Sequence, residues 1–247
     1  MKVKTILVTQ PRPESEKSPY FDLAKKYNLK IDFRAFINIE GIAAVDFRKD
    51  RINIPEHTSI ILTSRHAADN FFRICGEMRV TNIEEYKYFC ISESTAFYLQ
   101  KYITYRKRKI FYGKQNIIDL MEVMKKHKAD KFLLPCSDIA KQEIADALTE
   151  KGFQFTKAVI YRTVASDLSD LAQVKYDMLV FFSPAGITSL FKNFPDFEQN
   201  TTLIAAFGHT TSQAVNGAGL RLDIQAPVPE APSMTMSIEN YLRKNNK

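Results

Sequence analysis

Two stretches of this sequence repeat one pattern, Ile60-Ile-Leu-Thr-Ser64 and Leu179-Val-Phe-Phe-Ser183. Each is typical of a short buried strand that ends at a serine, and serine is a favoured cap for a following helix. Apolar residues recur 7, 8 and 11 positions after each serine, which places them on one face of a helix. A strand that runs into an amphipathic helix, found twice, predicts an α/β protein. The apolar residues are Phe71, Phe72 and Cys75 in the first copy and Leu190, Phe191 and Phe194 in the second.

The repeat continues downstream, where residues 90–96 align with residues 206–212. The two copies are offset by 119 residues at the serines and by 116 residues between Thr95 and Thr211. A period this long does not fit a solenoid. We therefore interpret it as a duplicated α/β domain, with two similar parallel-sheet lobes.

Short apolar runs alternate with amphipathic stretches along the whole chain, which favours parallel sheets covered by crossover helices. The predicted strands are 3–9, 30–37, 59–63, 87–91, 109–112, 131–134, 154–163, 177–182, 202–207 and 221–224. The predicted helices are 18–28, 65–78, 93–102, 115–127, 138–150, 184–194, 210–217 and 233–244.

The chain has 247 residues, enough for two domains. The repeat allows two divisions of it. Either the chain divides in the middle, or the N-terminal segment packs with the C-terminal half around an inserted middle domain. Two long extended segments, 30–39 and 153–163, favour insertion because they could pair as a two-stranded connector between the lobes.

A formal net charge of +7 favours an anionic partner. The densest basic runs, 106–109 and 125–128, are typical of solvated loops and helix ends. The aromatic and glycine spacing of RNA-binding or single-strand-binding modules is absent, so we expect no nucleic-acid partner.

The longest purely apolar run, residues 178–182, is far shorter than a membrane helix of roughly 20 residues. The N-terminal residues read as a strand and carry no signal peptide, so we expect a cytoplasmic protein without a membrane partner. The cysteines, Cys75, Cys90 and Cys136, each fall in or beside an apolar stretch and are interpreted as buried thiols in a reducing compartment.

The histidines, His57, His66, His127 and His209, lie far apart in sequence and show no spacing of metal ligands, so we expect no metal. The sequence contains no glycine-rich dinucleotide loop, Walker loop, nucleophile elbow or H-E-x-x-H motif. These absences argue against the commonest nucleotide-binding, hydrolase and zinc-enzyme classes.

Six short segments combine strand ends with polar turns along the whole chain: 5–13, 61–64, 158–163, 180–184, 208–212 and 232–237. In this order they resemble the uroporphyrinogen-III synthase family. The resemblance implies two α/β lobes with a ligand cleft between them. Residues 1–36 with 165–247 would form a discontinuous lobe, 40–155 an inserted lobe, and about 33–40 and 154–164 the connectors.

The resemblance also implies an activity. Members of the family are hydro-lyases of tetrapyrrole and heme biosynthesis that act without a cofactor, usually as monomers. They cyclise hydroxymethylbilane, a linear tetrapyrrole polycarboxylate, to uroporphyrinogen III and water with inversion of ring D. The alternative that we keep open is a non-catalytic two-lobed protein that binds an anionic ligand.

A ligand with eight carboxylates needs many hydrogen-bond donors, which helix N-termini and nearby polar side chains provide. Tyr161 matches the family's tyrosine near the bridging strand and is the candidate general acid, because a phenol stays protonated at pH 7. Without the resemblance, a strand tyrosine would be a packing residue and the serines and threonines helix caps. The candidate substrate-binding residues are Thr9, Ser64, Arg65, His66, Thr95, Ser183, Thr210 and Thr211.

Overall fold

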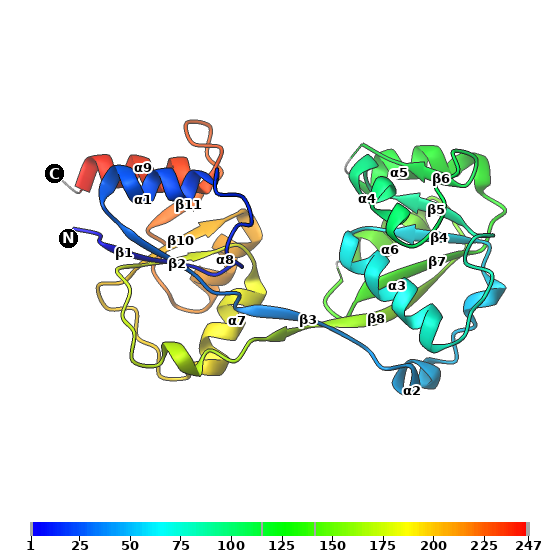
Figure 1. The fold of residues 1–247 in the computed structure, drawn as a ribbon, viewed down its shortest axis with the longest axis horizontal. Coiled ribbons are helices and arrows are strands. Elements are labelled where there is room, and N and C mark those ends of the chain that lie inside the picture. Colours follow the sequence, from blue (N-terminus) through cyan, green and yellow to red (C-terminus); the bar gives the residue numbers. More distant parts are fainter. Residues whose placement is uncertain (1, 115, 141, 246–247) are drawn as a thin grey trace. The chain divides into compact units, whose positions relative to one another are not determined.

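The protein is described here by a computed structural model, which covers residues 2–114, 116–140 and 142–245. The chain divides into two compact units (Figure 1). Unit 1 combines Met1–Asn38 with Val164–Lys247, and unit 2 is the continuous stretch Ile39–Thr163. Each unit has its own sheet and its own hydrophobic core.

Unit 1 contains a five-stranded sheet in which every neighbouring pair of strands is parallel. Its central strands are almost continuously apolar, as expected where helices cover both faces of a parallel sheet. In sheet order the strands are β11 (Ile224–Ala226), β10 (Leu203–Phe207), β9 (Met178–Phe181), β1 (Thr5–Val8) and β2 (Lys30–Phe33).

Helices cover both faces of this sheet (Figure 1). Leu23 of α1 and Ile238 of α9 belong to the core on one face, and Ile187 of α7 and Val215 of α8 belong to the core on the other. These helices are α1 (Pro19–Tyr27), α7 (Pro184–Asn193), α8 (His209–Gly217) and α9 (Met234–Asn245), with a 3-10 turn at η5 (Ser169–Leu171).

Unit 2 contains a six-stranded sheet in the order β3-β8-β7-β4-β5-β6, with parallel pairing from β8 to β6. Its strands are β3 (Ile37–Gly41), β4 (Ser59–Leu62), β5 (Lys87–Cys90), β6 (Ile110–Tyr112), β7 (Phe132–Ser137) and β8 (Phe155–Ala165). The outer strand β3 lies beside β8.

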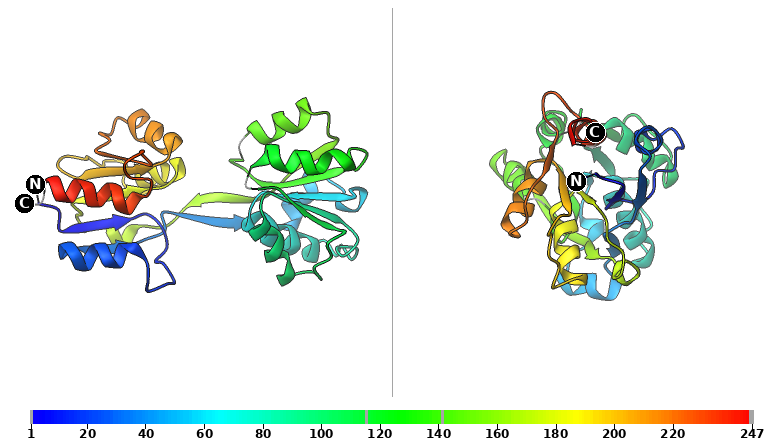
Figure 2. Two further views of the ribbon diagram at one scale, coloured as in Figure 1. Left: turned by 90° about the horizontal axis from the view of Figure 1, so that it is seen from above. Right: turned by 90° about the vertical axis from the view of Figure 1, so that its left-hand side faces the viewer.

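The two faces of this sheet are covered by different helices (Figure 2). Phe71 of α3 lies in the core on one face and Leu120 of α5 in the core on the other. The helices are α2 (Ala44–Phe47), α3 (Arg65–Glu77), α4 (Glu93–Tyr98), α5 (Ile117–Met124) and α6 (Gln142–Glu150). Short 3-10 turns are η1 (Arg48–Asp50), η2 (Ile54–Glu56), η3 (Leu99–Lys101) and η4 (Lys125–His127).

The two sheets share one strand order. Reading from one edge, β11-β10-β9-β1-β2 of unit 1 corresponds to β6-β5-β4-β7-β8 of unit 2. The repeated strands 59–63 and 177–182 predicted above are β4 and β9, which occupy the same position in this order. The prediction of two similar parallel-sheet α/β lobes is confirmed.

The prediction of one strand over residues 30–37 is wrong. β2 ends at Phe33 and pairs with β1, whereas β3 begins at Ile37 and belongs to the other sheet. Between them, Phe36 is 1% exposed and packs edge to face against Phe181 in the core of unit 1. The extended apolar pattern is the same in either sheet, so the sequence does not mark the change.

The prediction that a strand ends at residue 134 is also wrong, because β7 continues through Pro135 to Ser137. Proline usually ends a central strand because it lacks an N–H. Here the pairing of β7 with β4 stops at Leu133, so Pro135 leaves no gap in that ladder. The predicted helix 138–150 starts late: Asp138 and Ile139 form a turn, α6 is described from Gln142, and residue 141 lies outside the described residues.

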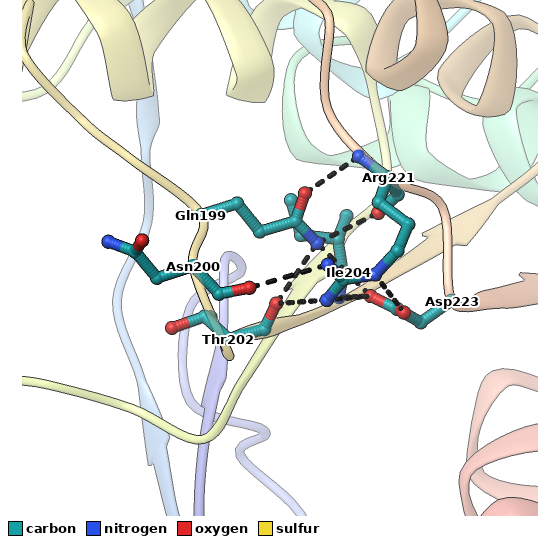
Figure 3. A network of polar contacts seen from close by, with 6 residues as sticks. All are labelled: Gln199, Asn200, Thr202, Ile204, Arg221 and Asp223. Atoms are coloured by element: carbon teal, nitrogen blue, oxygen red, sulfur yellow. Dashed lines mark hydrogen bonds and ion pairs between the residues drawn. The ribbon is translucent and has the colours of Figure 1, made fainter.

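A polar network joins the amino ends of β10 and β11 (Figure 3). Arg221 donates from Nε to Asp223 at 2.7 Å, and the other Asp223 oxygen accepts from the Ile204 amide at 2.9 Å. The Gln199 side chain donates to that carboxylate and to the Thr202 and Arg221 carbonyls, and accepts from the Arg221 amide. These polar atoms satisfy one another, so we interpret the network as structural.

We expect Asp223→Ala to lower the free energy of unfolding of unit 1 by about 2 kcal/mol, because it leaves the Ile204 amide without this acceptor and removes the shortest hydrogen bond of the Arg221 guanidinium. Denaturant titration measures the change. Asp196→Ala, which removes an exposed carboxylate from the same unit, should change it by less than about 0.5 kcal/mol. Equal effects of the two variants would contradict a structural role for the network.

No helix within the described part of the chain combines the length and the apolar character that crossing a bilayer requires.

Candidate active site

The candidate residues of unit 1 lie where the strand order of its sheet reverses. From β1 the chain moves outward to β2, and from β9 it moves the other way to β10. In open α/β sheets, ligands bind beyond the carboxyl ends of the strands at such a switch point. Thr9 follows β1 and Ser183 follows β9 at this place.

Thr9 and Ser183 stabilise the local backbone. The Thr9 hydroxyl is buried and donates to the Val180 carbonyl at 2.9 Å. Ser183 caps α7, and its Oγ accepts from the Gly186 amide at 3.3 Å. A side-chain carbon at Gly186 would lie 3.3 Å from the Phe181 ring and 3.8 Å from Thr9 Oγ1, so the start of α7 packs closely against the end of β1.

Thr210 and Thr211 lie in the first turn of α8, beyond the carboxyl end of β10. Thr210 is exposed, whereas Thr211 is 1% exposed and faces the protein. The N-cap of α8 is Gly208, whose φ of 87° favours glycine, and no side chain caps the helix. The donors that this turn presents are therefore the first amides of α8 and the exposed His209 and Thr210 side chains.

The corresponding switch point of unit 2 lies between β4 and β7. Ser64 follows β4 and caps α3 by accepting from the Ala67 amide at 3.0 Å. Ser137 ends β7, and its side chain is 9% exposed. In the shared strand order, Ser64 corresponds to Ser183, and Ser137 occupies the place of Thr9.

Tyr161 lies on β8, directly opposite Ser137 in the strand pairing. The ring is 8% exposed and belongs to the core of unit 2. Burial raises the pKa of the phenol, and the nearby Ser64 and Ser137 hydroxyls offset part of this increase in pKa. The phenol is therefore protonated at pH 7 and able to donate a proton.

The other candidates of unit 2 do not join this cluster. Arg65 is exposed, with its guanidinium 5.3 Å from the centre of the Tyr98 ring, and His66 is exposed beside it. Thr95 is 4% exposed inside α4, and its hydroxyl lies 3.1 Å from Oγ of Ser92, the residue that caps the helix. The sequence interpretation placed the polar turn at Thr95, but Ser92 is its capping residue.

Ser137 was missed in the candidate set. An alignment of the repeat in chain order matches β4 with β9 but does not match β7 with β1. The reason is that β1 comes before β9 in the chain, whereas β7 comes after β4. The shared strand order, which only the folded structure shows, makes Ser137 the counterpart of Thr9.

The described residues contain no group of three or more His, Cys, Asp or Glu side chains that could hold a metal ion. Cys75, Cys90 and Cys136 are unpaired and buried, which confirms the prediction of buried thiols. Burial raises the thiol pKa of Cys75 and Cys90 to about 12 and that of Cys136 to about 11, so all three are poor nucleophiles at pH 7.

A cavity of about 470 Å³ lies in unit 1 toward the amino edge of its sheet, between α7 and the loop before β9. Its walls are mainly apolar, and none of the candidate residues lines it. Its apolar lining includes Leu7, Phe36, Leu179, Leu190, Phe194 and Phe197. The cavity therefore does not belong to the candidate site, whose polar groups gather at the opposite edge.

Parallel α/β units with hydroxyls and helix N-termini at the carboxyl edges of their sheets form a class suited to anionic ligands. A family model described as Uroporphyrinogen-III synthase HemD matches residues 21–236. The chain belongs to the uroporphyrinogen-III synthase family.

Individual relatives agree with this assignment. The chain is similar to the uroporphyrinogen-III synthase of Chlorobaculum parvum, with 24% identity over 259 residues that cover 98% of this chain and 100% of the relative. Uroporphyrinogen-III synthetase from Helicobacter pylori has a TM-score of 0.65 at 15% identity, and a mutant uroporphyrinogen III synthase from Thermus thermophilus has 0.57 at 13%. Each match covers 98% of this chain and 100% of the other, and at these identities it shows the fold alone.

Proposed function

We propose that this chain is a hydro-lyase that cyclises hydroxymethylbilane to uroporphyrinogen III and water, with inversion of ring D. The observation that carries this proposal is the family match over residues 21–236. Two structural features support it: a polar switch point in each unit, and a buried, protonated tyrosine beside one of them.

Binding of the substrate carboxylates is assigned to the turns at the carboxyl edges of the two sheets. The N-terminal amides of α3, α7 and α8 carry partial positive charge and suit anions. The serine caps of α3 and α7 each occupy one amide, whereas the N-terminus of α8 has no side-chain cap. We therefore assign the strongest carboxylate contact of unit 1 to the α8 turn with Thr210. Arg65 and His66, both exposed, add donors in unit 2.

The assigned chemistry begins with loss of the terminal hydroxyl. The C–O bond of the hydroxymethyl group breaks, the Tyr161 phenol delivers its proton to the departing oxygen, and the oxygen leaves as water. The products of this step are an electrophilic azafulvenium cation and the Tyr161 phenolate, which regains its proton when ring D loses one at the final ring closure. The substituted carbon of the last pyrrole attacks this centre to form a spiro intermediate, which fragments and recloses with ring D inverted. The substrate also closes spontaneously without inversion, so the protein contributes selectivity by positioning.

The test supplies hydroxymethylbilane in a coupled assay and measures the ratio of uroporphyrinogen III to I after oxidation and separation. We expect mostly isomer III. Tyr161→Phe, which removes only the hydroxyl, should lower the rate of isomer III formation by about 100-fold and raise the share of isomer I. Tyr112→Phe, at an exposed tyrosine of the same unit, is the matched control and should leave the ratio unchanged.

Two results would count against the proposal. If the unmodified protein yields only isomer I while binding the substrate, the chain is a binding protein and not a synthase. If it yields isomer III and Tyr161→Phe does so equally fast, the general acid is another group.

A further inference from the structure

An extra residue interrupts β8 immediately before Tyr161. Cys136 of β7 pairs with Val159, but the next residue, Ser137, pairs with Tyr161, so Ile160 is inserted in the ladder. A bulge of this kind breaks the alternation of side chains and redirects the residue that follows. Accordingly Ile160 and Tyr161, although consecutive, are both buried in the same core.

The peptide between Ile160 and Tyr161 is held by a side chain of α3. Nη2 of Arg73 donates to the Ile160 carbonyl at 3.1 Å and to the Ile42 carbonyl at 2.9 Å. The Ile160 carbonyl also accepts from the Ile42 amide at 2.9 Å. The bulge is thus fixed by two donors at the peptide that sets the direction of Tyr161.

The guanidinium of Arg73 is itself held in place. Its Nε donates to Asn70 Oδ1 at 3.2 Å and its Nη1 to Glu77 Oε1 at 2.6 Å, both on α3. The other Glu77 oxygen accepts from the Ala44 amide at 3.1 Å. A planar guanidinium can satisfy these acceptors together, which a single ammonium cannot.

The same helix reaches the other end of the tyrosine. Ser64, which begins α3, lies beside the Tyr161 phenol, and Ser137 lies opposite it on β7. The N-cap of α3 and a later residue of the same helix thus act on this segment at two places: Ser64 lowers the pKa of the Tyr161 phenol, and Arg73 binds the Ile160 carbonyl.

We infer that Arg73 is a positioning residue for Tyr161: by binding the bulged Ile160 carbonyl, it fixes the backbone from which the phenol is directed toward Ser64 and Ser137. The chemical consequence rests on the function proposed above, whereas the structural link does not. Arg73 need not touch the substrate to set the ratio of isomers.

The first experiment tests the link without any turnover. The protein is labelled with fluorotyrosine, and the ¹⁹F resonance of Tyr161 is identified by its loss in Tyr161→Phe. In Arg73→Gln we expect this resonance to shift or broaden, while the resonances of the unit 1 tyrosines stay in place. An unchanged Tyr161 resonance in folded Arg73→Gln would overturn the inference.

Gly41→Ala provides a second route that leaves Arg73 in the sequence. A side-chain carbon at Gly41 would lie 2.5 Å from Cζ and Nε of Arg73, closer than a real contact allows, so the guanidinium must move. The Tyr161 resonance should shift here as well. If it shifts in neither variant, Arg73 does not position Tyr161.

The second experiment measures the chemical effect. We expect Arg73→Gln to lower kcat for isomer III by about tenfold with KM changed less than about twofold, and to raise the share of isomer I. Arg106→Gln, which removes an exposed cation of the same unit, controls for general attraction of a polyanion and should leave the isomer ratio unchanged.

The two proposals fail in different ways. A shift of the Tyr161 resonance without any isomer III from the unmodified protein would remove the proposed function and keep the structural link. Normal isomer III formation by Arg73→Gln would instead overturn the positioning role.

Discussion

Phe71→Ala should lower the free energy of unfolding of unit 2 by about 3–5 kcal/mol, the largest effect that we expect from one substitution in this chain. The Phe71 ring is 0% exposed, and its centre lies 5.3 Å from Phe72, 6.4 Å from Tyr86 and 6.3 Å from Tyr88 in edge-to-face contacts. Truncation removes these contacts and leaves a cavity beneath α3.

Calorimetry of the whole chain measures this effect, and the separate cores of the two units allow it to resolve two transitions. We expect Phe71→Ala to move the transition of unit 2 and to leave that of unit 1 in place. Phe97→Ala, at a phenylalanine of α4 that is 50% exposed, is the matched control and should cost less than about 1 kcal/mol. A common shift of both transitions would show that the units unfold together.

Asp177→Ala should lower the stability of unit 1 by about 2–3 kcal/mol at pH 7. Asp177 precedes β9, and one of its oxygens accepts from the Lys4 amide at 2.8 Å, the Thr5 amide at 2.9 Å and the Thr5 hydroxyl at 3.0 Å. The carboxylate therefore ties the start of β1 to the start of β9. Its removal leaves two backbone donors without their acceptor.

The same carboxylate gives unit 1 a dependence on pH. Burial acts to raise the pKa of Asp177, but the Lys4 and Thr5 donors outweigh it and hold the pKa below the ordinary 3.8. Because the pKa of Asp177 is lower in the folded state, the stabilisation that its carboxylate provides is complete well above pH 3.8. It is lost as the pH falls below 3.8 and through the lower folded-state pKa. Asp177→Asn should flatten this part of the stability curve, measured by denaturant titration from about pH 6 to about pH 2.5.

The control for this curve is Glu230→Gln, which removes an exposed carboxylate from unit 1. Glu230→Gln should leave the pH dependence of the free energy of unfolding of unit 1 as it is in the unmodified protein. An unchanged curve in Asp177→Asn would mean that other carboxylates account for the acid sensitivity.

Most of the α/β architecture follows from local sequence patterns. α3 and α7 were predicted within about a residue because an N-cap serine and a helical apolar stripe coincide in each. Most strand positions were predictable because fully buried parallel strands are short apolar runs, but the predicted strand 221–224 overlaps β11 only at Ile224. The short α2 and the turns near it were not predicted, since four residues carry no periodicity.

The candidate site was less accessible from the sequence. Ser64, Ser183 and Tyr161 stand in recognisable motifs, whereas Ser137 and Arg73 do not. Ser137 depends on a strand that runs through a proline, and Arg73 on a bulge that changes the alternation of β8. Both features arise from pairing between segments distant in the chain, which no local pattern records.

The way the chain crosses between its units also sets an order for folding. Unit 2 is continuous, so all the strands of its sheet are present once residue 165 has been synthesised. β1 can pair with β9 only later, because the Asp177 amide that donates to the Thr5 carbonyl lies 172 residues further along the chain. On the ribosome, β1 with its apolar Ile6, Leu7 and Val8 is therefore exposed while unit 2 already folds. β1 is thus the segment that a chaperone has most reason to shield.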